Sequence, residues 1–199
     1  MYGIKRFIDP IVEAIQKSRQ NIRQINDIDD EDFKQYVIDD ESDVTEALIG
    51  TALIVYQMYI TKIVSKVIKS NNYYQTKMPR KNIKLISTKK SDIMRYGNDL
   101  IPETNITKIE AINALANYFK HHSEWKVDWS HPTKRSKETM KMLRELGATP
   151  CSTGNLRRGI EKIGIEEYDQ IVSIIEILNK WRCKIYTEFK RVFTEKGLI

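Results

Sequence analysis

The chain has 199 residues, of which 41% are hydrophobic and 30% charged, and its formal net charge is +6. This composition excludes a disordered chain, and the length suits one domain. Only 8 glycines and 5 prolines are present, which favours long helices over many short strands. We therefore predict an all-α fold with one domain over residues 1–199.

The cysteines and the apolar runs indicate where in the cell the protein is found and whether it associates with membranes. Cys151 and Cys183 form neither a disulfide framework nor a zinc pattern, which is typical of a reducing compartment. Residues 1–16 lack the apolar centre of a signal peptide. The most apolar run, 47–60, is shorter than the roughly 20 residues that span a bilayer. We expect a cytoplasmic protein that does not associate with membranes.

The first half of the chain predicts two helices separated by a connector. Apolar residues recur at helical spacing over residues 3–25 and again over residues 43–70. Residues 27–43 are mostly acidic and polar, so we predict an acidic connector there with at most one short helix. Residues 71–80, which include Pro79, predict a loop, and the segment after them has no evident partner strand.

The second half predicts shorter helices and one long final helix. Thr107 and Glu110 have the spacing of a capping box, in which each side chain bonds the backbone amide of the other residue. Ser152 or Thr153 is expected to cap a later short helix. The predicted helices cover residues 91–96, 107–123, 136–146, 153–163 and 166–196. We expect an up-and-down bundle of two long and about four shorter helices, with residues 133–164 as an appended helical hairpin.

Charge is segregated along the chain. Residues 26–46 carry ten acids and one base, whereas residues 62–95 carry ten bases and one acid. A basic stretch of this kind suits a phosphate backbone, although both stretches also fit solvated faces that partly pair with each other. The residues that we expect to contact nucleic acid in this stretch are Lys77, Arg80, Lys81 and Lys84.

The three histidines, His121, His122 and His131, lie within eleven residues. Imidazole is the side chain that titrates near neutral pH, so histidine-based acid–base chemistry would occur in this segment. His121 and His122 are adjacent and point about 100° apart on a helix, which disfavours joint ligation of a metal ion. We therefore expect no metal site and no cofactor.

One polar stripe leads to His121. Asn113, Asn117 and His121 are spaced four residues apart, so they share one face of the helix that begins at Thr107. In a catalytic interpretation His121 transfers a proton, Asn117 orients it or a phosphate, Lys120 balances phosphate charge and Asn113 contacts the nucleic acid. In the alternative interpretation, the stripe faces solvent or forms a polar network that sets the register of the bundle.

The segment 116–121, Ala-Asn-Tyr-Phe-Lys-His, resembles the signature of the HEPN superfamily. That signature is Arg, then a polar residue that is often Asn, then three residues and His. Asn117 matches the polar residue and His121 matches the histidine, whereas Ala116 stands in the place of the arginine that would hold a phosphate. Lys120, one turn away, is the substitute cation.

The resemblance implies a compact α-helical bundle that acts on RNA. Many HEPN proteins are metal-independent endoribonucleases of bacterial antiphage and toxin–antitoxin systems, and they usually act as dimers. The 2′-OH of the RNA attacks the adjacent phosphate in a cleft where two motifs meet. The resemblance therefore implies RNA as a partner, together with a homodimer or another protein partner.

Two other functions remain open from the sequence. Residues 136–163 resemble a helix-turn-helix whose second helix would read bases with Arg157 and Arg158, although the turn is long and contains Pro150. Alternatively, the missing motif arginine suits a catalytically inactive binding module, such as an antitoxin or a subunit of a defence complex.

Overall fold

The computed structural model describes residues 2–25, 29–121, 129, 132–133, 136–150 and 152–198. Within these ranges the chain forms seven α-helices and no strands, which confirms the all-α helical bundle. The helices are α1 (Tyr2–Gln24), α2 (Glu31–Lys77), α3 (Lys90–Arg95), α4 (Lys108–His121), α5 (Lys137–Glu145), α6 (Asn155–Lys162) and α7 (Ile174–Glu195). Two 3₁₀ turns, η2 (Pro79–Lys81) and η3 (Tyr168–Ser173), complete the elements.

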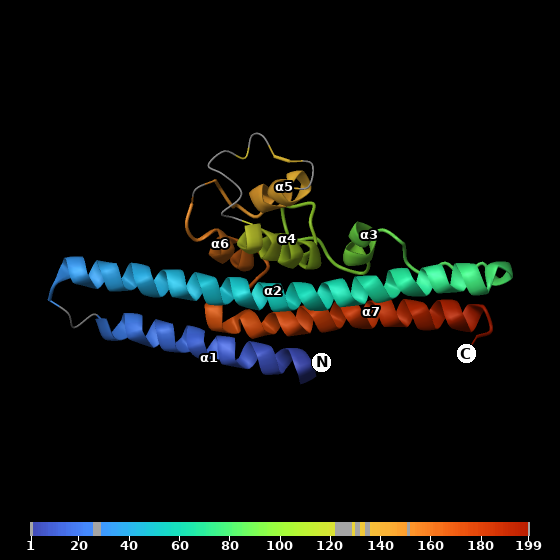
Figure 1. Cartoon of the computed structure of the whole chain (residues 1–199), viewed down its shortest axis with the longest axis horizontal. Helices are drawn as coiled ribbons and strands as arrows, with labels where there is room; N and C mark the ends of the chain where they lie inside the picture. Colours follow the sequence, from blue (N-terminus) through green and yellow to red (C-terminus); the bar gives the residue numbers. More distant parts are fainter. Residues whose placement is uncertain are drawn as a thin grey trace.

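Helix α2 is the spine of the protein. Its 47 residues correspond to a rod about 70 Å long. Helix α1 runs antiparallel to its first half, and α7 follows its second half in the same direction (Figure 1). The Tyr56 hydroxyl donates to the Ile171 carbonyl at 2.8 Å, and the Tyr74 and Phe193 rings lie 5.1 Å apart near the far end. Three helices are therefore long, rather than the two that we expected.

The expected acidic connector over residues 27–43 is wrong from Glu31 onward, because these residues form the first turns of α2. The Asp30 carboxylate caps the helix by accepting a hydrogen bond from the Phe33 amide at 3.0 Å. Glu31 and Asp32 follow in the first turn, where the helix dipole favours negative charge. The acidic residues at this point therefore indicate the start of a helix and not a connector.

Contacts with α1 hold the acidic turns in place. The Ser18 hydroxyl donates to the Glu41 carbonyl at 3.1 Å and also to its carboxylate, and the Asn21 amide donates to the same carboxylate at 2.7 Å. These hydrogen bonds from Ser18 and Asn21 lower the pKa of Glu41. Because they join residues about twenty positions apart in the sequence, local pattern could not indicate them.

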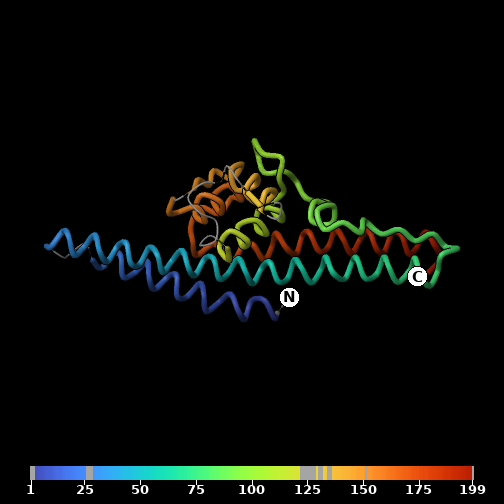
Figure 2. The backbone as a smooth tube through the Cα atoms, turned by 45° about the horizontal axis from the view of Figure 1, so that its top comes forward, coloured from blue at the N-terminus to red at the C-terminus, as the bar shows by residue number. Residues whose placement is uncertain are grey.

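The loop expected over residues 71–80 is also wrong, since α2 continues to Lys77. A small second core stabilises this end. Its buried members are Ile83, Leu85 and Val192, with Tyr74, Met78, Phe189, Phe193 and Leu198 packed around them. The segment after η2 folds back along α2 and forms no strand, as predicted (Figure 2).

Helix α4 begins at the predicted capping box. The Thr107 amide donates to the Glu110 carboxylate at 3.0 Å, and the Glu110 amide donates to the Thr107 hydroxyl at 3.3 Å. The same carboxylate oxygen lies 3.1 Å from Nε of Arg95 in α3. Glu110 is buried, so its carboxylate joins the start of α4 to α3.

We expect Glu110→Ala to lower the free energy of unfolding by about 1–2 kcal/mol, because the buried cap of α4 is lost. Urea denaturation followed by circular dichroism would measure this change. Glu138→Ala, at the exposed first turn of α5, is the matched control and should change stability by less than about 0.5 kcal/mol. Equal effects of the two variants would contradict the role of the capping box.

The remaining helices confirm the expected positions with two corrections. Gly154, at a φ of 73°, occupies the N-cap of α6 in place of Ser152 or Thr153. The carboxylate of Glu46 in α2 accepts from the Gly154 and Leu156 amides at 3.3 and 3.2 Å, so a distant residue caps this helix. The final helix expected from residue 166 begins at Ile174, after η3.

Helix α2 also meets the length and apolarity criteria for a membrane span. Over an 18-residue window its mean hydropathy is 1.5, and 44% of that window is buried inside the protein. The apolar part of α2 is thus at least 18 residues long, longer than the run 47–60 on which the expectation of no membrane association is based. A buried core helix satisfies the same criteria, so this is weak evidence for a membrane, and the expected location stays a prediction.

Candidate functional site

A buried polar network joins α2 to α4. The Gln57 side-chain amide donates to the Asn117 side-chain oxygen at 2.8 Å, and to the side-chain and backbone oxygens of Asn113 at 3.1 Å each. Gln57 and Asn113 are only 7% and 8% exposed. Asn113 and Asn117 of the predicted polar stripe therefore belong to a buried polar network between α2 and α4.

Lys90 brings a cation to this network from the start of α3. Its Nζ donates to the Asn113 side-chain oxygen at 3.1 Å. Partial burial lowers the pKa of Lys90, and repulsion by the nearby Lys120 ammonium lowers it further. Asn113 and Lys120 are seven residues apart on α4, so Lys120 lies on the same face of that helix as the oxygen that binds Lys90. The sequence pointed to Lys120 and missed Lys90.

His121 ends α4 at the same place. It follows Asn117 by one helical turn, so the two side chains share a face of the helix. His121 is half-buried and Lys120 is exposed. We call the assembly the α4 polar cluster, and it comprises Gln57, Lys90, Asn113, Asn117, Lys120 and His121. An imidazole can move a proton there, and two ammonium groups can stabilise charge on an oxygen anion.

The position of the absent motif arginine lies inside the core. Ala116 is 0% exposed, so this position carries no cation to the surface. Nearby, the ring of Phe119 lies over Gly50 of α2, closer than a Cβ on Gly50 would allow. This close approach places α4 near Gln57. Because position 116 supplies no cation, the positive charge of the cluster comes from Lys90 and Lys120.

Two of the three histidines, His122 and His131, lie outside the described residues, and so does Cys151. Across the described ranges, no group of three or more His, Cys, Asp or Glu side chains could hold a metal ion. The metal-free expectation itself stays a prediction.

Trp129 is buried at 2% exposure, and its ring lies 6.2 Å from that of Tyr118 in an edge-to-face arrangement. Arg144 of α5 donates to the Trp129 carbonyl at 2.7 Å. This tryptophan therefore attaches its segment to the bundle and offers no open face on which a base could stack.

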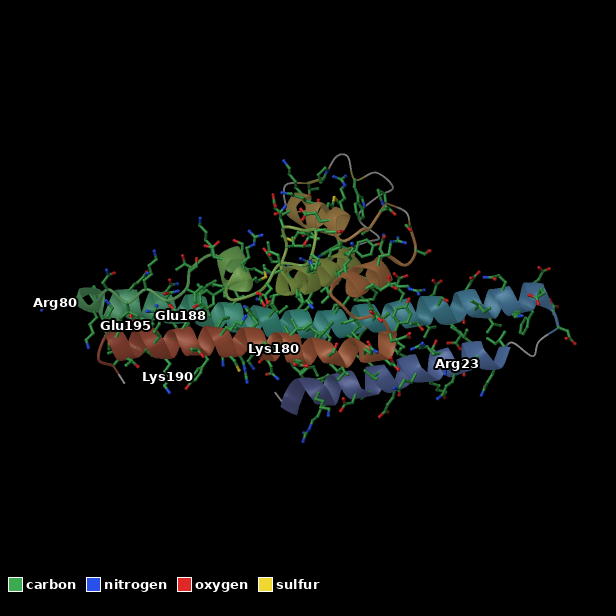
Figure 3. The ribbon with its side chains drawn as sticks, turned by 180° about the vertical axis from the view of Figure 1, so that it is seen from behind. Arg23, Arg80, Lys180, Glu188, Lys190 and Glu195 are labelled. Carbon is green, nitrogen blue, oxygen red and sulfur yellow. The ribbon has the colours of Figure 1, made fainter. Side chains whose placement is uncertain are left out.

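The predicted nucleic-acid residues of the basic stretch lie far from His121. Lys77, Arg80, Lys81 and Lys84 are all exposed at the distal end of α2, and Figure 3 marks that end with Arg80. Twenty residues of helix separate Lys77 from Gln57, which is about 30 Å along α2. The Lys81 ammonium donates to the Lys196 carbonyl at 3.1 Å and so closes the end of α7.

The two arginines of the helix-turn-helix alternative are engaged within the protein. Arg158 donates to the Ser152 hydroxyl at 2.6 Å and to the Asn155 side-chain oxygen at 2.7 Å. Arg157 pairs with Glu161 at 2.9 Å and lies 5.5 Å from the centre of the Tyr168 ring. Arg158 thus stabilises the turn before α6. Its guanidinium is engaged there and is poorly placed to hydrogen-bond a base.

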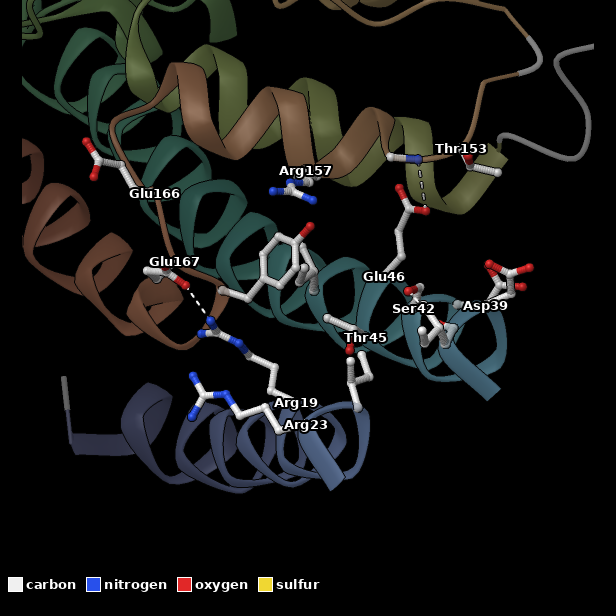
Figure 4. A pocket seen from close by; sticks show the side chains of 16 residues that line it. Arg19, Arg23, Asp39, Ser42, Thr45, Glu46, Thr153, Arg157, Glu166 and Glu167 are labelled. Atoms are coloured by element: carbon white, nitrogen blue, oxygen red, sulfur yellow. Dashed lines mark hydrogen bonds and ion pairs between the residues drawn. The ribbon is translucent and has the colours of Figure 1, made fainter. Parts of the chain in front are cut away.

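A cleft of about 880 Å³ lies between α1, α2 and α6 (Figure 4). Arg157 lines it, but none of the predicted catalytic residues does. Two of its charged side chains are engaged within the protein: Arg19 lies 2.6 Å from Glu167, and Glu46 caps α6 as described above. The cleft and the α4 polar cluster are therefore separate features.

Fold and site together define an all-α bundle with a basic, histidine-containing polar cluster to which α2, α3 and α4 contribute. Comparison of the chain with protein-family models, with curated proteins and with solved structures found no match. The function is therefore argued from the chemistry of the cluster and from the resemblance of residues 116–121.

Proposed function

We propose that this protein binds RNA and cleaves it at the α4 polar cluster without a metal ion, as a HEPN-like protein of a bacterial antiphage or toxin–antitoxin system. The observation that carries the proposal is the position of Lys90. The Lys90 ammonium comes from α3 and lies 3.1 Å from the side-chain oxygen of Asn113. Asn113 belongs to α4, which also carries Lys120 and ends in His121. Lys90 and Lys120 are the cations that we propose in place of the motif arginine, since position 116 itself is buried.

The chemistry that we propose is attack by the RNA on itself. His121 accepts the proton of a 2′-OH, whose oxygen forms a bond to the adjacent phosphorus while the bond to the 5′ oxygen breaks. The products are a 2′,3′-cyclic phosphate and a 5′-OH. Lys90 and Lys120 stabilise the negative charge that develops on the phosphate oxygens.

The leaving 5′ oxygen must also receive a proton. One imidazole that has just become protonated can supply it, or His121 of a second copy can do so in a homodimer. Asn117 has a positioning role in either case. Because its side-chain oxygen accepts from Gln57, its amide nitrogen is the group directed to a phosphate oxygen or to His121.

The test is cleavage of total cellular RNA in EDTA by the wild-type protein and by His121→Ala. Loss of the general base should slow cleavage by about 10²- to 10⁴-fold. Asn98→Ala, remote from the α4 polar cluster on the turn after α3, is the control and should cleave like the wild type. Undiminished cleavage by His121→Ala would contradict the proposal, and light scattering on the same samples would report dimerisation.

A second candidate is a binding module without catalysis, and one observation favours it. Ala116 is fully buried, while the side-chain oxygens of Asn113 and Asn117 serve the contact between α2 and α4. For such a module neither wild type nor His121→Ala would cleave RNA. Its partner would be captured equally by both proteins in a pull-down.

A further inference from the structure

A row of exposed basic side chains connects the distal end of α2 to the α4 polar cluster. Between residues 79 and 91 the chain carries five bases and no acid. Arg80, Lys84 and Lys89 are exposed, and Lys90 is exposed in part, with its ammonium against Asn113. The backbone of this segment runs from the distal end back along α2 to α3, so the row has a fixed course (Figure 2).

The core determines which side chains of this segment face solvent. Ile83 and Leu85 are each 1% exposed and belong to the second core, whereas Lys84 between them is exposed. The buried side chain of Asn71 fixes the backbone: its amide donates to the Ser87 carbonyl at 2.8 Å, and its oxygen accepts from the Leu85 amide at 2.9 Å. Lys84 is thus presented outward by a backbone with little freedom.

The row ends inside the α4 polar cluster. Its last member, Lys90, donates to Asn113 at 3.1 Å, and Lys120 lies two turns further along the same face of α4, next to His121. The opposite half of α2 is acidic from Glu31 to Glu46, so a polyanion is attracted on one side of the cluster and repelled on the other.

We propose that Arg80, Lys84, Lys89, Lys90 and Lys120 form a track that binds one RNA strand and leads it to His121. This inference rests on the proposed function and adds a substrate requirement. From the distal end of α2 to Asn113 the course is about 30 Å long, as judged from the helical rise of α2. A stacked strand has one phosphate per about 3.4 Å, so about nine nucleotides fill this part of the track. The substrate class is therefore RNA with a single-stranded stretch of at least this length.

The experiment uses full-length protein carrying His121→Ala, so that binding is measured without cleavage. Fluorescence anisotropy with labelled single-stranded RNAs of about 4, 8, 12 and 20 nucleotides would give the affinities. We expect affinity to rise steeply up to about 9–12 nucleotides and then to level off. Similar affinity for the 4- and 20-nucleotide RNAs would overturn the track.

Matched charge variants test the location. Lys84→Gln/Lys89→Gln removes two bases from the track, and Lys180→Gln/Lys190→Gln removes two exposed bases from α7 (Figure 3). We expect the first pair to weaken binding of the 20-nucleotide RNA at least tenfold and to reduce the salt slope of log K by about 1.4. The α7 pair should change affinity less than threefold. Equal losses in both pairs would mean a diffuse basic surface and overturn the track.

Failure of the track and failure of the ribonuclease proposal are distinguishable. If the wild type cleaves RNA while the Lys84→Gln/Lys89→Gln variant cleaves and binds as well as the wild type does, the track is wrong and the catalytic proposal stands. If length- and Lys84-dependent binding occurs without any cleavage, the track stands and the catalytic proposal is wrong. Circular dichroism of each variant would show that the helices are retained.

Discussion

Trp181→Ala is expected to lower the free energy of unfolding by about 3–5 kcal/mol, the cost of removing a large aromatic side chain from a core. Trp181 of α7 is completely buried. Its indole Nε1 also donates to the Ile93 carbonyl at 3.1 Å, which joins α7 to α3. The alanine variant therefore creates a cavity and removes one of the two donors to the Ile93 carbonyl, which keeps the Tyr96 amide.

The measurement is urea denaturation monitored by circular dichroism. Tyr186→Ala lies on the same helix and removes a side chain that is 69% exposed, so it should cost less than about 0.5 kcal/mol. Trp181→Phe retains most of the volume but loses the hydrogen bond, and its cost should lie between the two. A loss below about 1 kcal/mol for Trp181→Ala would show that this packing of α7 is wrong.

Gly50→Val is expected to destabilise the protein by about 1–3 kcal/mol, the usual range for inserting atoms into a packed interface. A Cβ at Gly50 would overlap the ring of Phe119. Relief requires α4 to move away from α2, which would lengthen the 2.8 Å hydrogen bond from Gln57 to Asn117. Cleavage by the α4 polar cluster should therefore fall together with stability.

The double variant Gly50→Val/Phe119→Ala provides the control. If the ring causes the strain, the double variant should be more stable than the sum of the two single losses indicates, with a coupling of about 0.5–3 kcal/mol. Strict additivity of the two changes would contradict the close approach of α2 and α4 at this point.

Local signals in the sequence predicted much of the fold. The capping box at Thr107 and Glu110 is a contact within one turn, so its spacing alone located the start of α4. Two other segments failed because distant contacts determine them. The acidic turns of α2 depend on hydrogen bonds from Ser18 to Glu41, and the last turns depend on packing of Tyr74 against Phe193.

In the candidate site, too, local patterns indicated some residues, whereas contacts between distant segments place the others. His121, Asn117 and Lys120 share one helix, so their periodicity revealed them. Gln57 could have been recognised from the sequence, since it is an amide within the most apolar run of the chain. No sequence pattern indicates Lys90, because its place beside Asn113 depends on the path that residues 79–90 take back along α2.

The unbroken course of α2 holds an acidic end and a basic end about 70 Å apart. Its first turns carry the acids from Glu31 to Glu46, and its far end carries Lys77 and the bases that follow. The length far exceeds the Debye screening distance of about 8 Å at physiological ionic strength, so the two poles act independently. Near a polyanion the field exerts a torque that turns the basic pole forward. We expect first encounters to occur end-on, with the acidic pole pointing to bulk solvent.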